Sequence, residues 1–197
     1  MLESDVQLYV NSMARIRERI NFIETVNVNQ INIPPPAFKA ELMFLQFRKV
    51  LEEIAFSTIA ANKNAYSVLH ASFSDQWKAK AILEGVNKVN ANFYPVPLQA
   101  PISAGHDHHF ELFAEGYLTP DEFVTLYEVS SQVLHTRNPY KQGDPMIQAK
   151  YTVQEWVSRI QKLLSWHQVQ LLNGDLWVIN IPSTGDIHAY AASPGSK

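Results

Sequence analysis

The spacing of apolar residues predicts a first helix that begins near Ser4. Apolar side chains recur there at steps of three and four residues, which places them on one helical face: Val6, Tyr9, Met13, Ile16, Ile20 and Ile23. Charged side chains lie mostly off this stripe, so the helix should present a single apolar face to a partner. Residues 27–36 end in three prolines and cannot continue the helix.

A second helix, about Phe38 to Asn62, is apolar around most of its circumference, which is typical of a helix in the middle of a bundle. Two pairs of opposite charge stand four residues apart in it, namely Arg48 with Glu52 and Lys49 with Glu53. One interpretation is two ion pairs on the solvent side, each worth about 0.2–0.5 kcal/mol. The other is a partly buried Arg48–Glu52 pair that lines a ligand-binding cleft.

Three further helices are expected, at about 74–90, 120–137 and 153–164. The second of these begins at Thr119-Pro-Asp-Glu122, which combines an N-cap threonine, a proline at the first helical position and a glutamate at the third. It should end near Arg137, because Pro139 follows. The last helix begins at a second capping box, formed by Thr152 and Glu155.

The periodicity changes to that of strands near the C-terminus. Residues 169–172 and 176–181 flank Asn173-Gly174, a strong hairpin signal because both residues readily adopt positive φ, and 187–191 make a third strand. Residues 90–105 are rich in proline and are expected to be irregular. The sequence therefore predicts the α+β class. We expect a mostly helical bundle of about five helices over residues 1–168, with a small antiparallel meander over 169–192 packed on it as one domain.

Composition narrows the possible functions. Hydrophobic residues make up 46% of the 197 residues and charged residues 18%, while the net charge of −3 argues against dominant electrostatic binding to nucleic acid. The absence of cysteine excludes disulfides and thiolate metal sites. No apolar run approaches the roughly 18 residues of a membrane helix, and the N-terminus lacks the apolar core of an export signal. We therefore expect a cytoplasmic bacterial protein with no membrane contact and, without a glycine-rich nucleotide fingerprint, no cofactor.

The segment His135-Thr-Arg-Asn-Pro-Tyr140 groups several chemically active side chains at a predicted helix end. Arginine and protonated histidine are favoured at a helix C-terminus, so these residues could simply cap the helix. Alternatively, Arg137 binds a phosphate or carboxylate through two parallel hydrogen bonds. In an enzyme, His135 would transfer the proton. The predicted ligand-binding residues are His135, Arg137, Asn138, Tyr140, Arg48 and Glu52.

Two other groups of residues could bind a ligand. His106, His108 and His109 are competent zinc or nickel ligands, but neighbours in one loop rarely converge on a single ion, so an exposed polar loop is the alternative. Several large aromatic residues could stack on a base or line a pocket, although at helical spacing they more often belong to the core. These aromatic residues are Trp77, Phe93, Tyr94, Trp156, Trp166 and Trp177.

A mostly helical domain with Arg137-Asn138 at a late helix end resembles the HEPN superfamily of small helical-bundle proteins, over about Phe38 to Leu164. The resemblance implies either a metal-independent ribonuclease of toxin or antiphage systems or a non-catalytic binding protein. In such a nuclease His135 and Arg137 would be catalytic. Nuclease members carry a histidine shortly after the arginine, whereas here the residues after Arg137 contain none up to Pro145.

Three functions stay open at this point. The first is a binding or regulatory module, in bacterial defence or stress, that recognises an anionic ligand or RNA near His135, Arg137 and Asn138. The second is the HEPN-like ribonuclease. The third is a non-catalytic interaction protein that forms a homodimer through the apolar stripe of its first helix. We favour a binding module over an enzyme because it does not need the missing histidine.

Overall fold

The computed structural model describes residues 2–60, 65, 67, 68, 71, 79–104, 107–135 and 150–192. Its helices are α1 (Leu2–Asn27), α2 (Pro36–Ala60), α4 (Ala79–Val89), α5 (Pro120–Leu134) and α6 (Val153–Leu164). Its strands are β1 (Val96–Pro97), β2 (Ile102–Ala104), β3 (Asp107–His109), β4 (Trp166–Gln170), β5 (Leu176–Asn180) and β6 (His188–Ala192). The predicted α+β class, mostly helical with an antiparallel C-terminal sheet, is confirmed.

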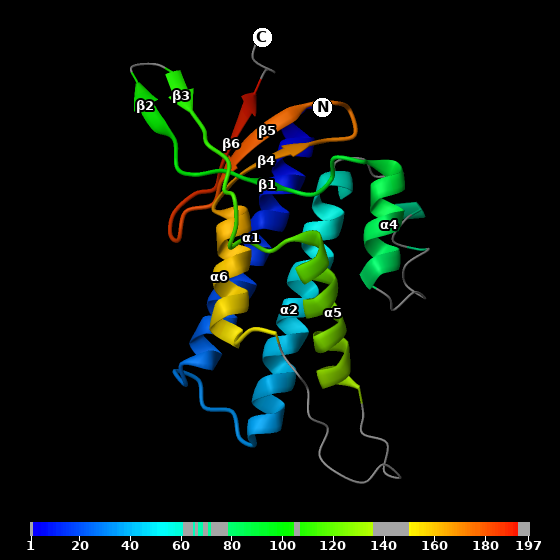
Figure 1. The fold of residues 1–197 in the computed structure, drawn as a ribbon, viewed down its shortest axis with the longest axis vertical. Helices are drawn as coiled ribbons and strands as arrows, with labels where there is room; N and C mark the ends of the chain where they lie inside the picture. Colours follow the sequence, from blue (N-terminus) through cyan, green and yellow to red (C-terminus); the bar gives the residue numbers. More distant parts are fainter. Residues whose placement is uncertain are drawn as a thin grey trace.

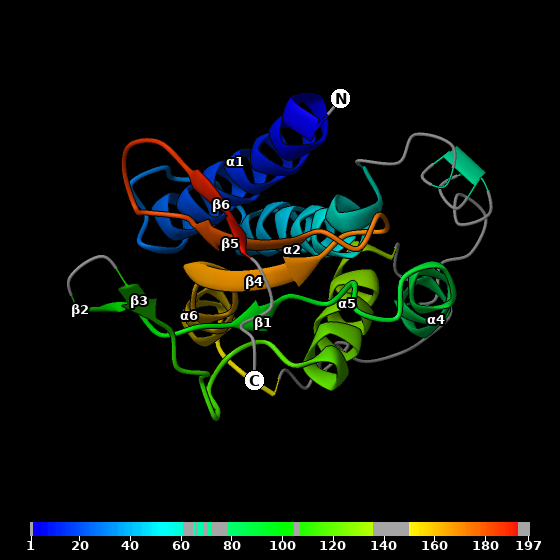
Figure 2. The same cartoon turned by 90° about the horizontal axis from the view of Figure 1, so that it is seen from above.

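The four-stranded sheet lies across one end of the helices (Figures 1 and 2), and its strand order is β1-β4-β5-β6. The hairpin β2–β3 forms a separate two-stranded sheet. Helix α2 packs against both α1 and α5, as its nearly continuous apolar surface predicts. No helix in the described part of the chain is long and apolar enough to cross a membrane.

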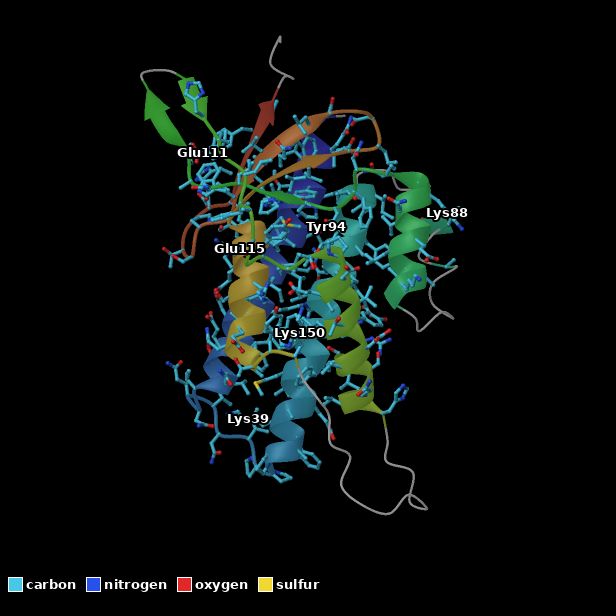
Figure 3. All side chains as sticks on the ribbon, viewed as in Figure 1. Lys39, Lys88, Tyr94, Glu111, Glu115 and Lys150 are labelled. Atoms are coloured by element: carbon cyan, nitrogen blue, oxygen red, sulfur yellow. The ribbon has the colours of Figure 1, made fainter. Side chains whose placement is uncertain are left out.

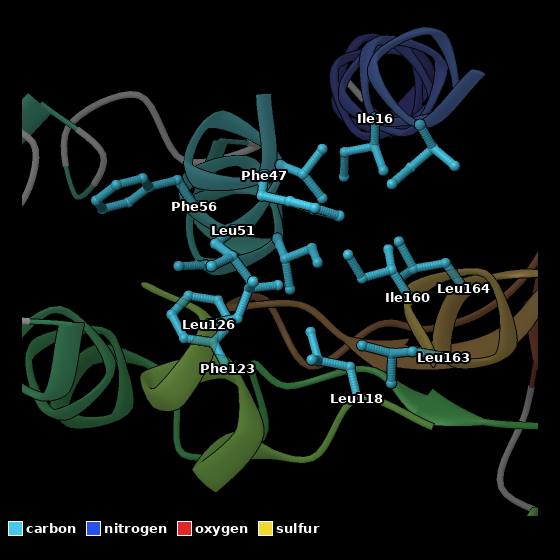
Figure 4. Close-up of a cluster of buried hydrophobic side chains, with 14 of the residues drawn as sticks. Ile16, Phe47, Leu51, Phe56, Leu118, Phe123, Leu126, Ile160, Leu163 and Leu164 are labelled. Atoms are coloured by element: carbon cyan, nitrogen blue, oxygen red, sulfur yellow. The ribbon is translucent and has the colours of Figure 1, made fainter. Parts of the chain in front are cut away.

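The core fills the space between α2 and its neighbours (Figure 4). Phe47 and Leu51 of α2 lie between Ile16 of α1 on one side and Phe123 and Leu126 of α5 on the other. All five of these side chains are buried. The spacing of the apolar residues therefore predicts which face of each helix meets the core.

Both predicted capping boxes are present. The Thr119 hydroxyl accepts a hydrogen bond from the Glu122 backbone N–H at 3.3 Å, and the Glu122 carboxylate accepts one from the Thr119 N–H at 3.3 Å. The same exchange joins Thr152 and Glu155 at the start of α6. These signals are local, so the sequence alone gives the position of both helix starts.

The sheet differs from the predicted meander in two respects. Strand β4 begins at Trp166, before the expected start, and β1 comes from the proline-rich segment that was expected to be irregular. Val96 pairs with Gln168, and Pro97 pairs with His167. Pro97 is tolerated because β1 is the edge strand, where the missing N–H removes little from the ladder. The helical segment 1–168 therefore also supplies strands to the sheet.

The turn between β4 and β5 uses one residue with positive φ rather than the predicted two. Gly174 has φ 86°, whereas Asn173 does not have a positive φ. Instead, the Asn173 side-chain oxygen accepts a hydrogen bond from the Asp175 N–H at 3.1 Å. The Gly174 N–H donates to the Leu171 carbonyl at 3.0 Å. The predicted hairpin is confirmed, whereas the predicted positive φ at Asn173 is wrong.

Replacing Gly174 with alanine should lower the free energy of unfolding by about 1–2 kcal/mol. A Cβ at this position would meet no atom within 4 Å, so backbone strain at positive φ is the whole cost. Urea unfolding followed by circular dichroism measures the change. A loss of only a few tenths of a kcal/mol would mean that the turn adopts another conformation without strain.

Candidate functional site

The predicted anion site at the end of α5 is described only in part. His135 is the C-cap residue of α5, where its backbone N–H donates to the Ser131 carbonyl at 3.0 Å and its side chain is exposed. Arg137, Asn138 and Tyr140 lie outside the described residues. The convergence of these side chains therefore stays a prediction.

The predicted metal loop folds in part as a hairpin. His108 pairs with Ser103 and His109 pairs with Ile102 across β2 and β3, while His106 lies outside the described residues. The side chain of His109 is exposed. Within the described ranges, no group of three or more histidine, aspartate or glutamate side chains lies close enough together to hold a metal ion.

The Arg48–Glu52 pair forms on α2, and only its glutamate lines a groove. The Arg48 Nε and the Glu52 Oε1 are 3.3 Å apart, and the arginine side chain is only 12% exposed. The Arg48 guanidinium lies 4.8 Å from the centre of the Tyr127 ring on α5. Arg48 therefore lies between α2 and α5, whereas Glu52 lines a groove on the side of α2 that faces α1.

That groove runs between α1 and α2 and has a volume of about 520 Å³. Glu52 accepts a hydrogen bond from Lys49 at 3.0 Å, so the expected Lys49–Glu53 pair is wrong. Glu53 instead reaches across to α1, where its oxygens lie 3.1 Å from Arg15 Nε and 3.5 Å from Arg19 Nε. Each carboxylate of the groove therefore already contacts two cations.

A second hollow, of about 310 Å³, lies between α1, α6 and the turn that joins β5 to β6. We call it the α1–α6 pocket. Aliphatic side chains form its floor, and three of them face one another between the two helices in Figure 4 (Ile16, Ile160 and Leu164). The remaining aliphatic residues of the floor are Ile20 and Ile181. The rim is polar, with Asn21, Ser165 and Ser183 among its residues.

Arg17 lies at one end of the rim of the α1–α6 pocket. Its Nη1 donates to the carbonyls of Pro182 at 3.1 Å and Gly185 at 2.8 Å. In the part of the chain that is described, no carboxylate lies within 4.0 Å of this guanidinium. Glu24 is the acidic residue of the rim, and it accepts a hydrogen bond from the Gln161 amide at 3.4 Å. The pocket thus has an apolar floor, a cation that meets no counter-charge in the described ranges, and an acid that accepts a hydrogen bond from an amide.

No family model, curated protein or solved structure matches this chain. The ranking of candidate sites therefore depends on the geometry of its own residues. The α1–α2 groove is polar, but its charges satisfy one another. The α1–α6 pocket combines an apolar interior with a few placed polar groups, which is the usual composition of a small-molecule site.

At the start of α5 and α6 the buried carboxylate of Glu122 is surrounded by hydrogen-bond donors, which indicates a structural role. Glu122 accepts hydrogen bonds from Arg159 at 3.0 Å, Tyr151 at 2.8 Å and Lys150 at 3.2 Å. Figure 3 labels Lys150 in this region, beside α5. Burial alone would raise the pKa of Glu122, but the hydrogen bonds from Tyr151, the Thr119 N–H and Lys150, with the charge of Arg159, hold that pKa below its ordinary value.

A buried histidine links α1 to the sheet. His167 Nδ1 lies 2.8 Å from the Leu164 carbonyl, and its Nε2 lies 2.8 Å from the Tyr9 hydroxyl. A carbonyl only accepts, so Nδ1 carries the proton and Nε2 accepts from Tyr9. Burial, opposed in part by the bond to Leu164, lowers the pKa of His167 to about 4. Because the side chain is inaccessible to solvent, this pair supports the fold rather than a reaction.

The aromatic residues divide between the core and the surface. Phe93, Trp156 and Trp177 are buried, as the core interpretation predicts. Tyr94 is partly buried and donates a hydrogen bond to the Leu118 carbonyl at 2.7 Å. Trp77 lies outside the described residues. Trp166 is only partly buried, and its ring centre lies 5.6 Å from that of Phe110 and 6.4 Å from that of Tyr190.

The sequence does not reveal the α1–α6 pocket. Its walls come from α1, α6 and the residues around Pro182, which are far apart in the chain and meet only through the tertiary fold. Arg17 gives a weak signal, because it lies off the apolar stripe of α1 in a group of charged residues. Nothing in that local pattern distinguishes it from Arg15, which pairs with Glu53.

Proposed function

We propose that this protein is a binding module for a small amphipathic anion, which it holds in the α1–α6 pocket. The observation that supports this proposal is the Arg17 guanidinium, which lies at the rim of an aliphatic hollow and has no carboxylate partner among the described residues. The volume of about 310 Å³ lies within the range of natural ligand sites. This proposal retains the anionic ligand that the sequence predicts. It differs in the site, which is the α1–α6 pocket rather than the end of α5.

The chemistry of the pocket favours a molecule with two different ends. An apolar body would displace water from the part of the aliphatic lining that is still open to solvent, such as the partly buried Ile181, and burial of apolar surface would favour binding. A carboxylate at the other end would accept charge-assisted hydrogen bonds from Arg17, whose Nη1 is already fixed by two carbonyls. Fixing the guanidinium in advance reduces the entropy lost on binding.

Binding is favoured over catalysis by the side chains around the pocket. Its described lining contains the hydroxyls of Ser165 and Ser183 but no histidine that could activate them. His167, the histidine closest in sequence to Ser165, is buried and engaged with Tyr9 and Leu164. We therefore propose a module that recognises its ligand without changing it.

The Arg17→Gln variant should bind octanoate about tenfold more weakly than the unchanged protein, because one charge-assisted contact is lost. Affinity for 1-octanol, which has the same chain without the charge, should change little. Isothermal titration calorimetry measures both ligands. Arg15→Gln is the matched control, since Arg15 lies on the same helix and its guanidinium pairs with Glu53. This control should retain the octanoate affinity.

Two results would count against the proposal. Failure of the unchanged protein to bind octanoate or its longer homologues would remove the α1–α6 pocket as a site for amphipathic anions. Equal losses in the Arg17→Gln and Arg15→Gln variants would show a general effect of net charge rather than a contact in the pocket.

A further inference from the structure

The outer face of the four-stranded sheet carries a row of aromatic side chains. In each strand, alternate residues point to opposite faces. His167, Val169, Trp177 and Ile179 are buried on the face toward α1. Their neighbours in sequence therefore project from the opposite face, which we call the outer sheet face. It is unrelated to the α1–α6 pocket.

Four rings follow one another across the outer sheet face. The ring centres of Phe110 and Trp166 are 5.6 Å apart, and those of Trp166 and Tyr190 are 6.4 Å apart with planes parallel to within 10°. The ring of His188 follows, 6.3 Å from that of Tyr190. Tyr190 is 50% exposed. His188 is exposed as well, whereas Phe110 and Trp166 are partly buried. An aromatic row that reaches solvent on a domain with a filled core indicates a binding surface.

Two amide side chains lie on the same face of the sheet as these rings. Asn180 is the register partner of Trp166 and of His188, and Gln168 and Tyr190 are both register partners of Val178. Within the described residues, the side-chain amides of Gln168 and Asn180 make no hydrogen bond. Each amide supplies donors and an acceptor, so the outer sheet face offers both to a ligand.

The charge of the surface decides which class of ligand it fits. Strands β1, β4, β5 and β6 contain no aspartate, glutamate, lysine or arginine. A surface for single-stranded nucleic acid combines stacking rings with cations that track the phosphates, and these strands supply no such cations. Rings with neutral amides instead suit a ligand that has apolar C–H faces and many hydroxyl groups.

We propose that the outer sheet face binds a neutral glycan. The aromatic rings of Trp166 and Tyr190 stack on the C–H faces of sugar rings, while the amides of Gln168 and Asn180 exchange hydrogen bonds with the hydroxyls. No covalent step is involved, and the site is independent of Arg17.

The test compares the binding of cellohexaose, chitohexaose and maltohexaose to the full chain by NMR titration. At least one of these glycans should shift the resonances of β4 and β6, and Tyr190→Ala should weaken that binding about tenfold or more. Tyr190→Phe, which keeps the ring, should retain most of it. Phe38→Ala is the matched control, because Phe38 is an aromatic residue of similar exposure (57%) on α2, away from the sheet.

A second variant covers the case in which Tyr190→Ala fails to fold. Gln168→Leu preserves a side chain of similar size and removes only the amide, so it should weaken glycan binding while leaving the circular dichroism spectrum unchanged. The proposal is overturned if none of the three glycans binds, or if Tyr190→Ala or Gln168→Leu, once folded, binds as tightly as the unchanged protein. Binding of a uridine hexanucleotide to this face without binding of any glycan would overturn it as well.

Discussion

Replacing Glu122 with glutamine should lower the free energy of unfolding by about 3 kcal/mol. The Glu122 side chain is only 8% exposed and lies against Arg159, whose Nη1 is 3.0 Å away. Neutral glutamine would leave that arginine without its counter-charge in a partly buried position, and would weaken the bonds from Tyr151 and Lys150. Urea unfolding at neutral pH measures the loss.

The chain supplies a matched control for this variant. Glu155 has the same position in the capping box of α6 as Glu122 has in that of α5, but its side chain is exposed. Glu155→Gln should therefore cost much less stability than Glu122→Gln. Equal losses would show that capping alone, and not the buried charge, accounts for the effect.

The pKa of Glu122 adds a dependence on pH to the same comparison. This pKa lies below its ordinary value in the folded protein, so the carboxylate contributes stability above the pKa of the unfolded chain and loses it as the pH falls through the folded value. The difference between Glu122→Gln and the unchanged protein should therefore shrink in acid. A difference that stays constant down to low pH would contradict this account.

Stability should also decrease between about pH 6.5 and pH 4 because of His167. Its pKa is lowered to about 4 in the folded protein, against an ordinary value of 6.5. Within this window the unfolded chain binds a proton that the folded chain does not, so stability falls as the pH falls. The difference between the two pKa values corresponds to about 3 kcal/mol. Unfolding free energies measured across the window test this expectation.

Variants of two histidines separate this effect from other titrations. His167→Gln removes the buried imidazole and should flatten the dependence of stability on pH between 5 and 6.5, whatever its cost at neutral pH. His188→Gln changes an exposed histidine on β6 and should leave the dependence unchanged. A slope that persists in His167→Gln would assign it to other groups.

Sequence reasoning succeeds here where the signal is local or where one element contains all of it. The helix starts at Thr119 and Thr152 depend on residues three positions apart, and the central place of α2 follows from its own composition. Strand β1 was missed because it is two residues long, contains a proline, and finds its partner Gln168 far away in the chain.

The candidate sites show the same limit. Glu52 lines a groove, as one of the two interpretations of the Arg48–Glu52 pair expects, whereas Arg48 lies against Tyr127 of α5. The predicted partner of Glu53, Lys49, is wrong, because Glu53 pairs with Arg15 of α1 instead. The α1–α6 pocket and the aromatic row of the outer sheet face both join segments that only the tertiary fold brings together.

The two edges of the four-stranded sheet are unequally protected against pairing with another chain. Beside β1, the Leu98–Leu112 bridge continues the ladder, and Pro97 removes a donor. The outer edge of β6 pairs with no strand of the described chain, and β6 contains neither a charged residue nor a proline. Charges and prolines are the usual means by which natural sheets prevent edge-to-edge aggregation. The outer edge of β6 is therefore the part of this sheet where pairing with a strand of another chain meets the least opposition.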